Sequence, residues 1–349
     1  MINIQKNIPL APLTTFKIGG PAKYFVEVSS EDEILEALNY AKENNLEIFV
    51  LGGGSNILVS DDGFDGLVIK IQDTCLPGRQ ARYKIQEDKI EISAGASLSS
   101  VVNLATQNSL SGLEWASGIP GTVGGAIRGN AGIPLGCMAD SVESVKTIVI
   151  ASPALSGINS AKQSLSNKNS TNSTRSFANA QDDIRILEFQ NNECRFSYRN
   201  SIFKENKDLI IISAVLKLEK GDQEEISKKI KELIENRLKV VHPNPKEPSS
   251  GSFFKNPKVD NPELVANFEK DTGQKAIDGK IPAGWLIDEV GLRGKKIGGA
   301  QVSEKHANFV VNVGNAKAQD IVMLSSVIKM KVRDELGVQL SEEIQYVGF

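Results

Sequence analysis

The order of apolar and polar residues near the start of the chain predicts a strand, a helix and a second strand. Residues 25–28 and 48–51 are short apolar runs, which is typical of buried strands. Between them, Ser30 and Glu33 form a capping box, and apolar residues follow at helical spacing. The second strand of this β-α-β unit runs directly into the glycine-rich residues 52–56, a common way to present backbone N–H groups to a ligand.

The chain continues with patterns that favour further strands. Residues 67–71 form an apolar run, and residues 83–85 are predicted to pair with the alternating residues 89–92 as a hairpin. A helix is predicted from about Ser97, where apolar residues again recur at helical spacing. Strand character returns at residues 142–150.

Six glycines crowd into residues 118–132, which read GIPGTVGGAIRGNAG. Because each glycine loses more backbone entropy on ordering than any other residue, we expect no ordinary helix or strand here. Successive N–H groups in such a segment can form a concave nest for a phosphate. A tight structural turn between packed elements is the alternative, and it would be favoured if this stretch stood alone.

A second glycine-rich stretch favours the phosphate-binding interpretation over the structural turn. Residues 52–56 read GGGSN and are followed by the apolar residues 57–59, which favour a strand. A Rossmann-type dinucleotide fingerprint needs spaced glycines that open a helix, so a nicotinamide site of that type is disfavoured. We expect instead that two glycine-rich loops at strand ends hold one diphosphate from two sides.

A surface insertion is predicted at residues 151–186. This segment is dominated by Ser, Asn, Ala and Gln and shows no sustained apolar period. It cannot bury enough surface to offset the entropy of ordering it. Since long loops cost little free energy, a tolerated insertion without fixed structure is favoured over a lid or a partner-binding motif.

Regular patterns resume after the insertion. Residues 209–218 form a long apolar strand, and Asp222 and Glu225 open an amphipathic helix at which we place the start of a second domain. The later pattern predicts helices at residues 282–290 and 318–336, and strands at residues 308–312 and 342–347.

Length and charge narrow the class of protein. The 349 residues are enough for two or three domains. A net charge of -3 and a pI near 5.7 argue against a nucleic-acid binder. No apolar run is long enough to span a bilayer and no signal peptide opens the chain, so we expect a cytoplasmic protein without a membrane partner. Cys75, Cys137 and Cys194 fit reduced thiols, and with only two histidines no metal centre is expected.

A set of motifs occurs in one order along the chain. They are TTFKIGGPA at residues 14–22, GGGSN at 52–56, IPGTVGGA at 119–126, Tyr-Arg-x-Ser at 198–201, GSFFKNP at 251–257 and VSxKHANF at 302–309. Each motif alone is weak to moderate evidence, whereas the ordered set is specific. Together they resemble the UDP-N-acetylenolpyruvoylglucosamine reductase family of peptidoglycan precursor synthesis, over almost the whole chain outside the insertion.

The resemblance implies an α+β fold with an FAD-binding domain of the vanillyl-alcohol-oxidase type, followed by an α/β substrate-binding domain. We place the first domain at residues 1–218, with lobes at about 1–61 and 62–218, and the second at residues 219–349. By this resemblance NADPH reduces FAD, and the enolpyruvyl group of the nucleotide-sugar substrate then receives hydride to give UDP-N-acetylmuramate. We expect a monomer.

The resemblance also implies which residues bind the cofactor. Both glycine-rich loops would hold FAD, through Gly52, Gly53, Gly54, Ser55, Asn56, Ile119, Pro120, Gly121, Thr122, Gly125 and Ala126. It places substrate binding on Tyr198, Lys255 and Asn256. No residue is assigned to a metal.

Three catalytic residues are expected. Hydride addition to an enolpyruvyl group pushes negative charge towards the carboxylate, and Arg199 suits that charge because a guanidinium stays protonated and forks onto carboxylates. The resemblance places protonation of the enolate carbon on Ser252 and matches Glu343 to the family's C-terminal catalytic glutamate. Such a carboxylate beside an anionic substrate needs a raised pKa or an arginine partner.

Simpler interpretations of these side chains stay open at this point. Arg199 could form a surface ion pair, Ser252 could cap the turn after Gly251, and Tyr198 could belong to the core. Glu343 could be confused with its neighbour Glu342. His306 could serve the fold as readily as the substrate.

The family pattern is not followed everywhere. Gly129 stands where the family usually has a larger apolar residue, and Ile-Pro-Leu at residues 133–135 replaces Ala-Tyr-Gly, so flavin packing near that turn is expected to differ. Another FAD-dependent oxidoreductase or an oxidase on the same fold is the nearest alternative, and a flavin-carrying scaffold without activity is a second. Oxidases of this fold often tether flavin through a histidine in the first domain, and no histidine precedes His242.

Overall fold

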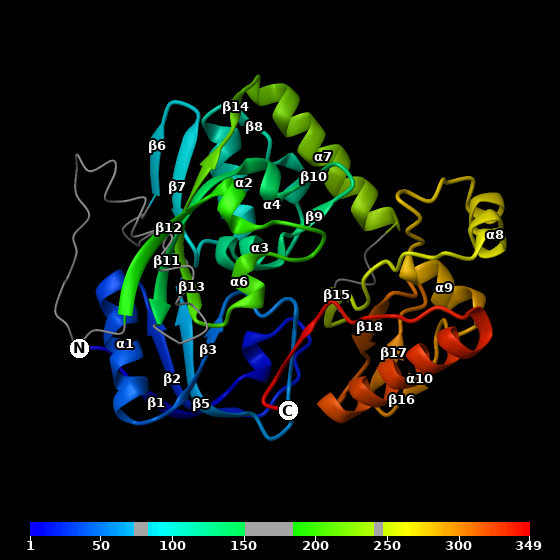
Figure 1. Ribbon diagram of the computed structural model, residues 1–349, viewed down its shortest axis with the longest axis horizontal. Helices are drawn as coiled ribbons and strands as arrows, with labels where there is room; N and C mark the ends of the chain where they lie inside the picture. Colours follow the sequence, from blue (N-terminus) through cyan, green and yellow to red (C-terminus); the bar gives the residue numbers. More distant parts are fainter. Residues whose placement is uncertain (73–82, 151–183, 241–246) are drawn as a thin grey trace.

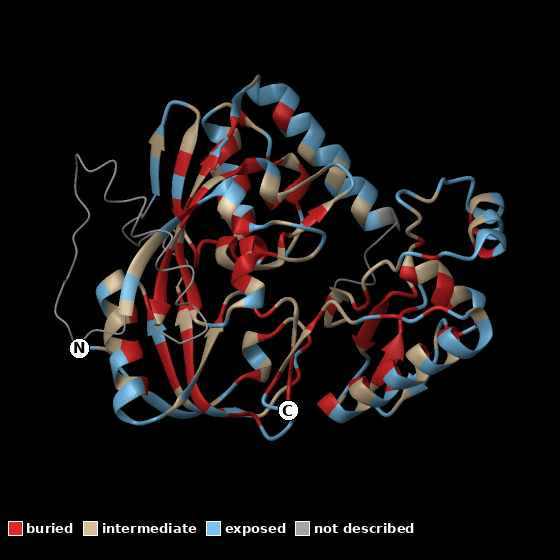
Figure 2. Cartoon of the chain, in the orientation of Figure 1, coloured by how far each residue is buried: buried red, intermediate tan, exposed pale blue. Residues whose placement is uncertain are grey.

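The computed structural model describes residues 1–72, 83–150, 184–240 and 247–349. Figure 1 shows a larger body with two sheets and a smaller body that carries the C-terminal helices. Buried residues follow the central strands of the larger body and the sheet of the smaller one (Figure 2). The mixture of helices and strands agrees with the fold class predicted from the sequence.

The first sheet has the strand order β1-β2-β5-β3, with β2, β5 and β3 parallel and β1 antiparallel. Its strands are β1 (Gln5–Pro9), β2 (Pro21–Val28), β3 (Glu47–Leu51) and β5 (Phe64–Ile71). Helix α1 (Glu31–Glu43) links β2 to β3, which confirms the predicted β-α-β unit. Since β5 lies between β2 and β3, this sheet extends past residue 61, where we expected the first lobe to end.

The start of α1 shows how the sequence specifies a helix end. Ser30 Oγ accepts a hydrogen bond from the Glu33 N–H at 3.2 Å, as the capping box predicts. The Glu33 carboxylate reaches one residue further back, where it accepts from the Ser29 N–H at 2.6 Å. The helix then buries Ile34, Ala37, Leu38 and Ala41 against the first sheet.

The second sheet is antiparallel, in the order β12-β11-β13-β7-β6. Its strands are β6 (Tyr83–Gln86), β7 (Lys89–Ser93), β11 (Val142–Ile150), β12 (Ile184–Gln190) and β13 (Leu209–Lys217). The predicted hairpin of residues 83–92 is confirmed, and α2 (Leu98–Gln107) begins after Ser97 as expected. One apolar core joins residues of both sheets, so the two lobes pack as a unit.

The boundary of the predicted insertion needs correction. Residues 151–183 lie outside the described part of the chain. Residues 184–186, which we had assigned to the insertion, open β12 and pair with β11. Ile184 and Ile186 alternate with Arg185, a pattern that favours a strand by itself, although its phase differs from that of Leu187 and Phe189.

Short elements complete the first body. They are β4 (Ile57–Val59), β8 (Leu110–Ser111), α3 (Val123–Gly129), β9 (Gly132–Ile133), β10 (Gly136–Cys137), α4 (Met138–Ser141), α6 (Ile202–Glu205), β14 (Glu219–Lys220) and three 3-10 turns at Ala11–Leu13, Glu114–Ala116 and Asn191–Cys194.

The prediction that the glycine cluster of residues 118–132 forms no helix was wrong, because α3 occupies its second half. Thr122 caps the helix, since its Oγ1 accepts from the Gly125 N–H at 3.3 Å. A Cβ on Gly124 would lie 2.8 Å from the Ala94 Cβ, closer than side-chain carbons approach. At this position glycine therefore allows the helix to pack tightly on the second sheet.

The smaller body is built on an antiparallel sheet in the order β15-β18-β17-β16. Its strands are β15 (Ser249–Ser252), β16 (Lys296–Ile297), β17 (Ala300–Val302) and β18 (Phe309–Asn312), and its helices are α8 (Pro262–Thr272), α9 (Ala283–Glu289) and α10 (Ala318–Leu336). The predicted bounds of α10 are confirmed, and those of α9 agree to within a residue. Helix α8 has no counterpart among the predicted elements.

The end of the chain returns to the first body (Figure 1). Strand β19 (Gln345–Val347) pairs in parallel with β4, so the predicted final strand is shorter than residues 342–347. Asp61 adds a second link, because its carboxylate accepts from the Ala318 N–H at 2.9 Å and from the Gln319 N–H at 3.3 Å at the start of α10. These contacts fix the smaller body against the larger one.

Helix α7 (Gln223–Val240) begins at Asp222, whose Oδ1 accepts from the N–H groups of Glu224 and Glu225 at 2.9 Å. We placed the start of the second domain at this helix. In the structure α7 packs on α2 and on the turn at Glu114–Ala116, both in the first body. The division at residues 218 and 219 stays a prediction.

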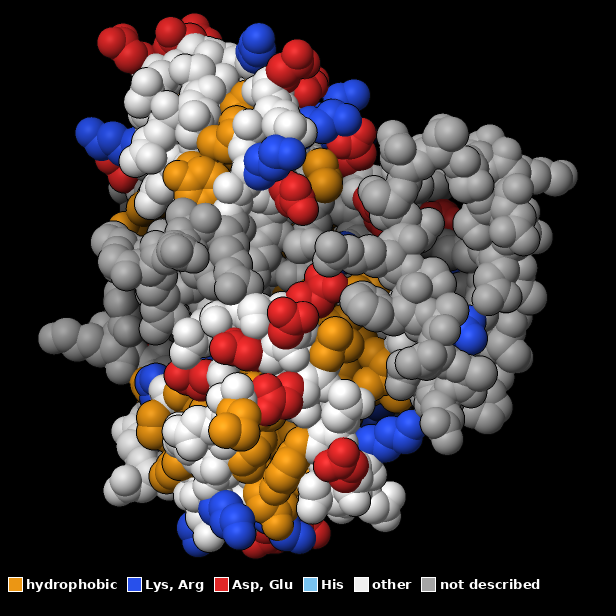
Figure 3. Space-filling model, turned by 90° about the vertical axis from the view of Figure 1, so that its left-hand side faces the viewer, with side chains coloured by type: hydrophobic (Ala, Val, Ile, Leu, Met, Phe, Trp, Pro, Cys, Tyr) orange, Lys and Arg blue, Asp and Glu red, His pale blue; other side chains and the backbone are white. Residues whose placement is uncertain are grey.

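The surface and the helices add two observations. In the side view of Figure 3, acidic and basic side chains are interspersed, and the described atoms of that face form no continuous basic surface of the kind that nucleic-acid binders carry. Among the described helices, none combines the length and the apolar character that crossing a membrane requires.

Cys137 and Cys194 are free thiols, whereas Cys75 lies outside the described residues.

Candidate active site

The two glycine-rich loops border one large cavity, which is lined mainly by the first body and by the C-terminal segment, with residues 247–252 and Phe309 from the smaller body. Its volume is about 1570 Å³, which exceeds what a single drug-sized ligand needs and is sufficient for a dinucleotide together with a substrate. Every residue for which the sequence predicted FAD binding lines this cavity: Gly52, Gly53, Gly54, Ser55, Asn56, Ile119, Pro120, Gly121, Thr122, Gly125 and Ala126.

The two loops touch each other directly. A Cβ on Gly53 would lie 2.7 Å from the Gly121 Cα, and Ser55 Oγ donates to the Pro120 carbonyl oxygen at 3.2 Å. Glycine is therefore required where the loops meet, as the turn interpretation proposed. The two interpretations are compatible, because close loops also bring their N–H groups to one place.

The GGGSN loop has unused hydrogen-bond donors. Within the described chain, the backbone N–H groups of Gly53, Gly54 and Ser55 donate to no protein acceptor. Consecutive N–H groups of this kind form an anion-binding nest. With the second glycine loop in contact, the residues present fit a diphosphate group such as that of FAD.

Arg199 is held in an unusual backbone conformation. Ser197 and Asn200 exchange two hydrogen bonds of 3.1 Å, which closes a tight turn around Tyr198 and Arg199. The φ angle of Arg199 is +57°, in the left-handed region that a side chain such as arginine rarely adopts. Strained backbone of this kind persists where surrounding contacts hold it, and it concentrates at functional sites.

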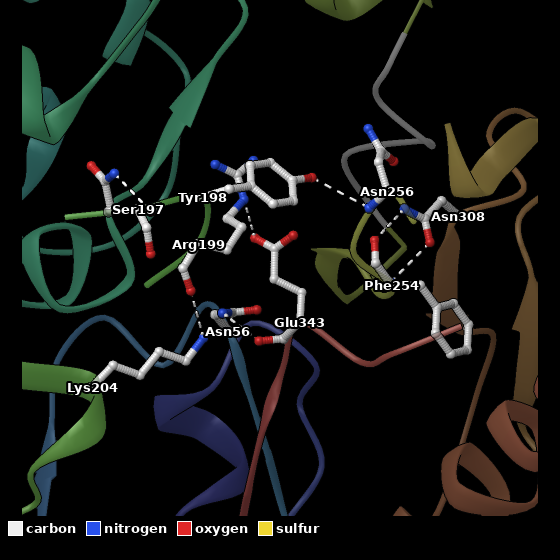
Figure 4. Close-up of polar contacts among 10 residues, drawn as sticks. Asn56, Ser197, Tyr198, Arg199, Lys204, Phe254, Asn256, Asn308 and Glu343 are labelled. Carbon is white, nitrogen blue, oxygen red and sulfur yellow. Dashed lines mark hydrogen bonds and ion pairs between the residues drawn. The ribbon is translucent and has the colours of Figure 1, made fainter. Parts of the chain in front are cut away.

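Glu343 faces Arg199 from the other body (Figure 4). Its Oε1 lies 2.7 Å from the Arg199 Nε, and the two side chains are 15% and 23% exposed. The backbone of Glu343 is fixed by its N–H, which donates to the Phe253 carbonyl oxygen at 2.8 Å, and by its own carbonyl oxygen, which accepts from Asn56 Nδ2 at 3.3 Å. The pair excludes the interpretation of Arg199 as part of a surface ion pair.

The ionisation of Glu343 is balanced between burial and positive charge. Burial raises the pKa of its carboxyl group above the usual value, while Arg199, Lys204 and Lys255 act in the opposite direction. Burial lowers the pKa of the Lys204 ammonium, helped by repulsion from Lys255, Arg128 and Arg199. Glu343 thus has both a raised pKa and an arginine partner, the two features of which the sequence analysis expected at least one for a carboxylate beside an anionic substrate.

Ser252 lies at the end of β15 and lines the same cavity as Arg199 and Glu343. It pairs with Phe309 of β18, and the preceding Gly251 has a φ of +78°, so glycine is needed to turn the strand there. The fold therefore brings together the three side chains that the sequence assigned to catalysis, from segments far apart in the chain. Their chemical roles stay predictions.

Two of the three predicted substrate-binding residues, Tyr198 and Asn256, contact each other outside the cavity lining. Tyr198, Lys255 and Asn256 are absent from the described lining of the cavity. The Asn256 N–H donates to the Tyr198 hydroxyl at 3.3 Å (Figure 4), and the Lys280 ammonium lies 4.3 Å from the centre of the Tyr198 ring. Tyr198 is 41% exposed, so the interpretation of this residue as part of the core was wrong.

The structure bears on two other open alternatives. Glu342, the neighbour of Glu343, pairs with Lys329 of α10 and not with Arg199. His306 has a structural contact, since its Nδ1 accepts from the Asn308 N–H at 3.2 Å. Burial lowers the pKa of this imidazole.

Several cationic residues of the cavity lining were not singled out from the sequence, among them Lys204 and Arg128. Lys204 donates from Nζ to the Arg199 carbonyl oxygen at 3.1 Å, and Arg128 donates to Gln345 Oε1 at 3.0 Å. Both line the cavity with Arg199. The only sequence signal was position, because Arg128 lies within the glycine cluster and Lys204 closely follows the Tyr-Arg-x-Ser motif.

Residues at which this chain departs from the family pattern also line the cavity. Gly129, Ile133 and Pro134 all belong to its lining, and a Cβ on Gly129 would meet no atom within 4 Å. The backbone at residue 129 does not itself require glycine. A larger side chain would have room there, so this chain leaves additional space beside the second loop.

Comparisons with known proteins agree with this geometry. Residues 22–151 match the family model described as "FAD binding domain". Residues 243–347 match the model described as "UDP-N-acetylenolpyruvoylglucosamine reductase, C-terminal domain". The two matches cover the body with the glycine loops and the segment from which Ser252 and Glu343 come.

Full-length relatives carry the same description. The chain is 36% identical over 342 residues to the UDP-N-acetylenolpyruvoylglucosamine reductase of Caldanaerobacter subterraneus, covering 98% of this chain and 93% of the relative. It is 37% identical over 354 residues to that of Carboxydothermus hydrogenoformans, covering 99% and 94%. The crystal structure of the reductase from Thermus caldophilus superposes with a TM-score of 0.69 at 29% identity, covering 99% of this chain and all of that one.

Proposed function

Because the chain belongs to the UDP-N-acetylenolpyruvoylglucosamine reductase family, we infer that it is an FAD-dependent UDP-N-acetylmuramate dehydrogenase of peptidoglycan precursor synthesis. The observation that carries this function is the single cavity lined by both glycine loops, Arg199, Ser252 and Glu343. When bound, FAD would accept hydride from reduced nicotinamide and pass it to the enolpyruvyl group of the substrate. We propose NADPH as the hydride donor, and a monomer as the active unit.

Arg199 is proposed to stabilise charge on the substrate. Hydride addition at the far carbon of the enolpyruvyl group places negative charge on the carboxylate side, and an electrostatic partner fixed in advance lowers the barrier. The guanidinium of Arg199 is oriented by its contact with Glu343 and by the closed turn of residues 197–200. It therefore needs little rearrangement when the negative charge develops.

Ser252 is proposed to donate the proton that completes the reduction. Its position at the end of β15 holds the hydroxyl in the cavity, on a rigid element rather than a free loop. A serine hydroxyl is a weak acid, so it needs surroundings that stabilise the alkoxide or resupply the proton. The nearby cations Arg199 and Lys204, which line the same cavity, provide a positive environment of that kind.

Glu343 is proposed to act with Arg199. The ion pair keeps the guanidinium in place before the substrate arrives, and the raised pKa of Glu343 allows its carboxyl group to take up a proton when an anionic substrate enters. Lys255, Asn256 and Tyr198 are proposed to bind the enolpyruvate or diphosphate side of the substrate. The hydrogen bond between Asn256 and Tyr198 supports a common surface for these two residues beside the cavity, and Lys255 precedes Asn256 in the chain.

A purified preparation tests this function in two steps. The visible absorption of oxidised flavin should be present, and incubation with NADPH and UDP-N-acetylglucosamine enolpyruvate should give UDP-N-acetylmuramate by mass spectrometry. Rapid peroxide formation from NADPH in air, without need for the enolpyruvyl substrate, would instead indicate an oxidase. Light scattering tests the monomer.

Replacing Ser252 by alanine tests the proton donor. We expect turnover of Ser252→Ala to fall by roughly 10²–10⁴-fold, the usual contribution of a positioned acid. Reduction of the flavin by NADPH should be retained, because that step needs no proton from Ser252. Ser326→Ala, an exposed serine on α10, is the matched control. Unchanged turnover in Ser252→Ala would remove this residue from the mechanism.

A further inference from the structure

The side chain of Lys204 contacts the backbone of the turn that precedes its own helix. Lys204 belongs to the short helix α6, yet its side chain folds back on the preceding turn and donates from Nζ to the Arg199 carbonyl oxygen at 3.1 Å (Figure 4). The side chain is partly buried and lines the cavity. A lysine on the surface would leave its ammonium in water, so this arrangement indicates a specific role.

The hydrogen bond from Lys204 reaches a residue with a strained backbone conformation. Arg199 has a φ of +57°, which costs an arginine free energy that a glycine would not lose. Its turn is held from three sides. Asn130 Nδ2 donates to the Ser197 carbonyl oxygen at 3.0 Å, Ser201 Oγ donates to the Arg128 carbonyl oxygen at 2.7 Å, and Lys204 holds the Arg199 carbonyl oxygen.

The backbone of Arg199 decides where its guanidinium points. In the left-handed conformation the side chain crosses the gap between the two bodies and places Nε 2.7 Å from Glu343 Oε1. A return of residue 199 to an ordinary conformation would redirect the Cα–Cβ bond and break this contact. The Lys204 bond therefore acts on the Arg199–Glu343 pair without touching Glu343 itself.

We propose that Lys204 is a positioning residue, whose ammonium holds the Arg199 carbonyl so that the guanidinium meets Glu343 and the substrate carboxylate in a fixed orientation. The inference rests on the roles of Arg199 and Glu343 in the proposed function. Lys204 also contributes charge. Together with Arg199 and Lys255 it faces Glu343, and Lys255, Arg128 and Arg199 are the other cations close to its own ammonium.

Substitution of Lys204 by methionine tests the proposal, because methionine keeps an unbranched side chain and removes both donor and charge. Flavin content and melting temperature establish that the variant folds. We expect kcat to fall by roughly a hundredfold, the scale of a misplaced catalytic group, with a much smaller change in KM. Lys204→Arg should restore most of the turnover because it keeps a charged donor, and Lys228→Met on the exposed face of α7 should behave like the wild type.

A second measurement does not depend on activity. The ionisation of Glu343 can be followed through the pH dependence of stability. The wild type is compared with Glu343→Gln at each pH, and Lys204→Met is compared with the double variant that also carries Glu343→Gln. Removal of one positive charge should move the Glu343 midpoint to higher pH. Lys204→Gln keeps a donor but no charge, so it should show the same shift with a smaller loss of kcat.

The outcomes separate this proposal from the proposed function. An inactive wild-type enzyme would overturn the proposed function, while the stability measurement would still test Lys204. An active wild type with unchanged kcat in Lys204→Met would overturn the positioning role. A Glu343 midpoint that does not move in Lys204→Met would overturn the charge contribution of Lys204, because that midpoint responds to charge. A rise in KM alone would also overturn the positioning role, since that would assign Lys204 to direct binding of the substrate.

Discussion

At the scale of single residues, the Arg199–Glu343 pair explains how a carboxylate can be kept in an anionic site. Burial and the cations around Glu343 oppose one another, and the net effect raises the pKa of its carboxyl group. If Glu343 were neutral, it could not form an ion pair with Arg199. If it were ionised without a partner, burying its charge would cost free energy. In the observed arrangement the buried Glu343 carboxyl group is paired with Arg199, and its pKa is raised.

This shift predicts how stability depends on pH. The unfolded pKa of glutamate is about 4.3 and the folded pKa of Glu343 lies above it, so the folded state binds the proton more tightly. The stability contribution of Glu343 is therefore fully present below the unfolded pKa and is lost as pH rises through the folded pKa. Glu343→Gln has no carboxyl group at this position and does not lose this stability. Its melting temperature relative to that of the wild type should therefore increase as the pH rises from the unfolded pKa through the folded pKa of Glu343.

Thermal melts of both proteins over a pH series check this prediction. Glu342→Gln is the matched control, because Glu342 lies next in the chain but pairs with Lys329 instead. A melting-temperature difference for Glu343→Gln that stays constant with pH, or that falls as pH rises, would contradict the direction of the pKa shift.

The residues proposed for catalysis could be singled out from the sequence, whereas Lys204, which is proposed to act through a contact with the backbone, could not. Arg199, Ser252 and Glu343 were found because each belongs to or lies near a motif, and the structure places all three at one cavity. Lys204 was missed because a sequence does not show that an ammonium will contact a main-chain oxygen of the preceding turn. Its value to the site is visible only in the geometry.

At the scale of elements, the second glycine stretch shows where local reasoning fails. Glycine lowers helix stability, and on that ground the whole stretch was assigned to a loop. Packing of Gly124 against Ala94 and capping by Thr122 outweigh this preference in α3. Helix α8, by contrast, had clear signals that we did not use: Asn261 as cap, Pro262 at the first position and Gly273 after the end.

The start of α10 gives a test at this scale. Lys317 occupies the cap position but its side chain offers no acceptor, and Asp61 of the first body supplies the missing carboxylate to Ala318 and Gln319. Asp61→Ala should therefore cost about 1 kcal/mol of stability, the usual loss for a helix cap. Because the cap comes from another body, the loss should weaken attachment of the smaller body as well as α10.

Chemical denaturation of Asp61→Ala, followed by circular dichroism, measures this cost. The exposed neighbour Asp62 makes no such contact through its carboxylate within the described chain, so Asp62→Ala is the control. Equal stabilities of the two variants would show that the carboxylate of Asp61 does not act as a cap.

At the scale of the whole molecule, the sequence predicted the identity of the parts better than their arrangement. The β-α-β unit, the hairpin at residues 83–92 and α10 follow from local periodicity, and the ordered motifs identified the family. The return of β19 to β4 and the cap from Asp61 join residues far apart in the chain. No local pattern specifies such pairings, although they are what bring Glu343 to Arg199.

The arrangement explains why the site needs both bodies. The first body supplies the glycine loops and Arg199, while β15 and the segment before β19 supply Ser252 and Glu343. Cofactor and substrate would then meet in the space between the two bodies, where water can be excluded during hydride transfer.

We propose that hydride passes from FAD to an enolpyruvyl nucleotide sugar within one cavity, with the help of Arg199, Ser252 and Glu343. The most direct test is an anaerobic single turnover, in which enzyme reduced by NADPH is freed of excess NADPH and mixed with UDP-N-acetylglucosamine enolpyruvate. The visible absorption of oxidised flavin should return together with an equal amount of UDP-N-acetylmuramate. Flavin that stays reduced with this substrate, yet is reoxidised rapidly on admission of air, would contradict this proposal.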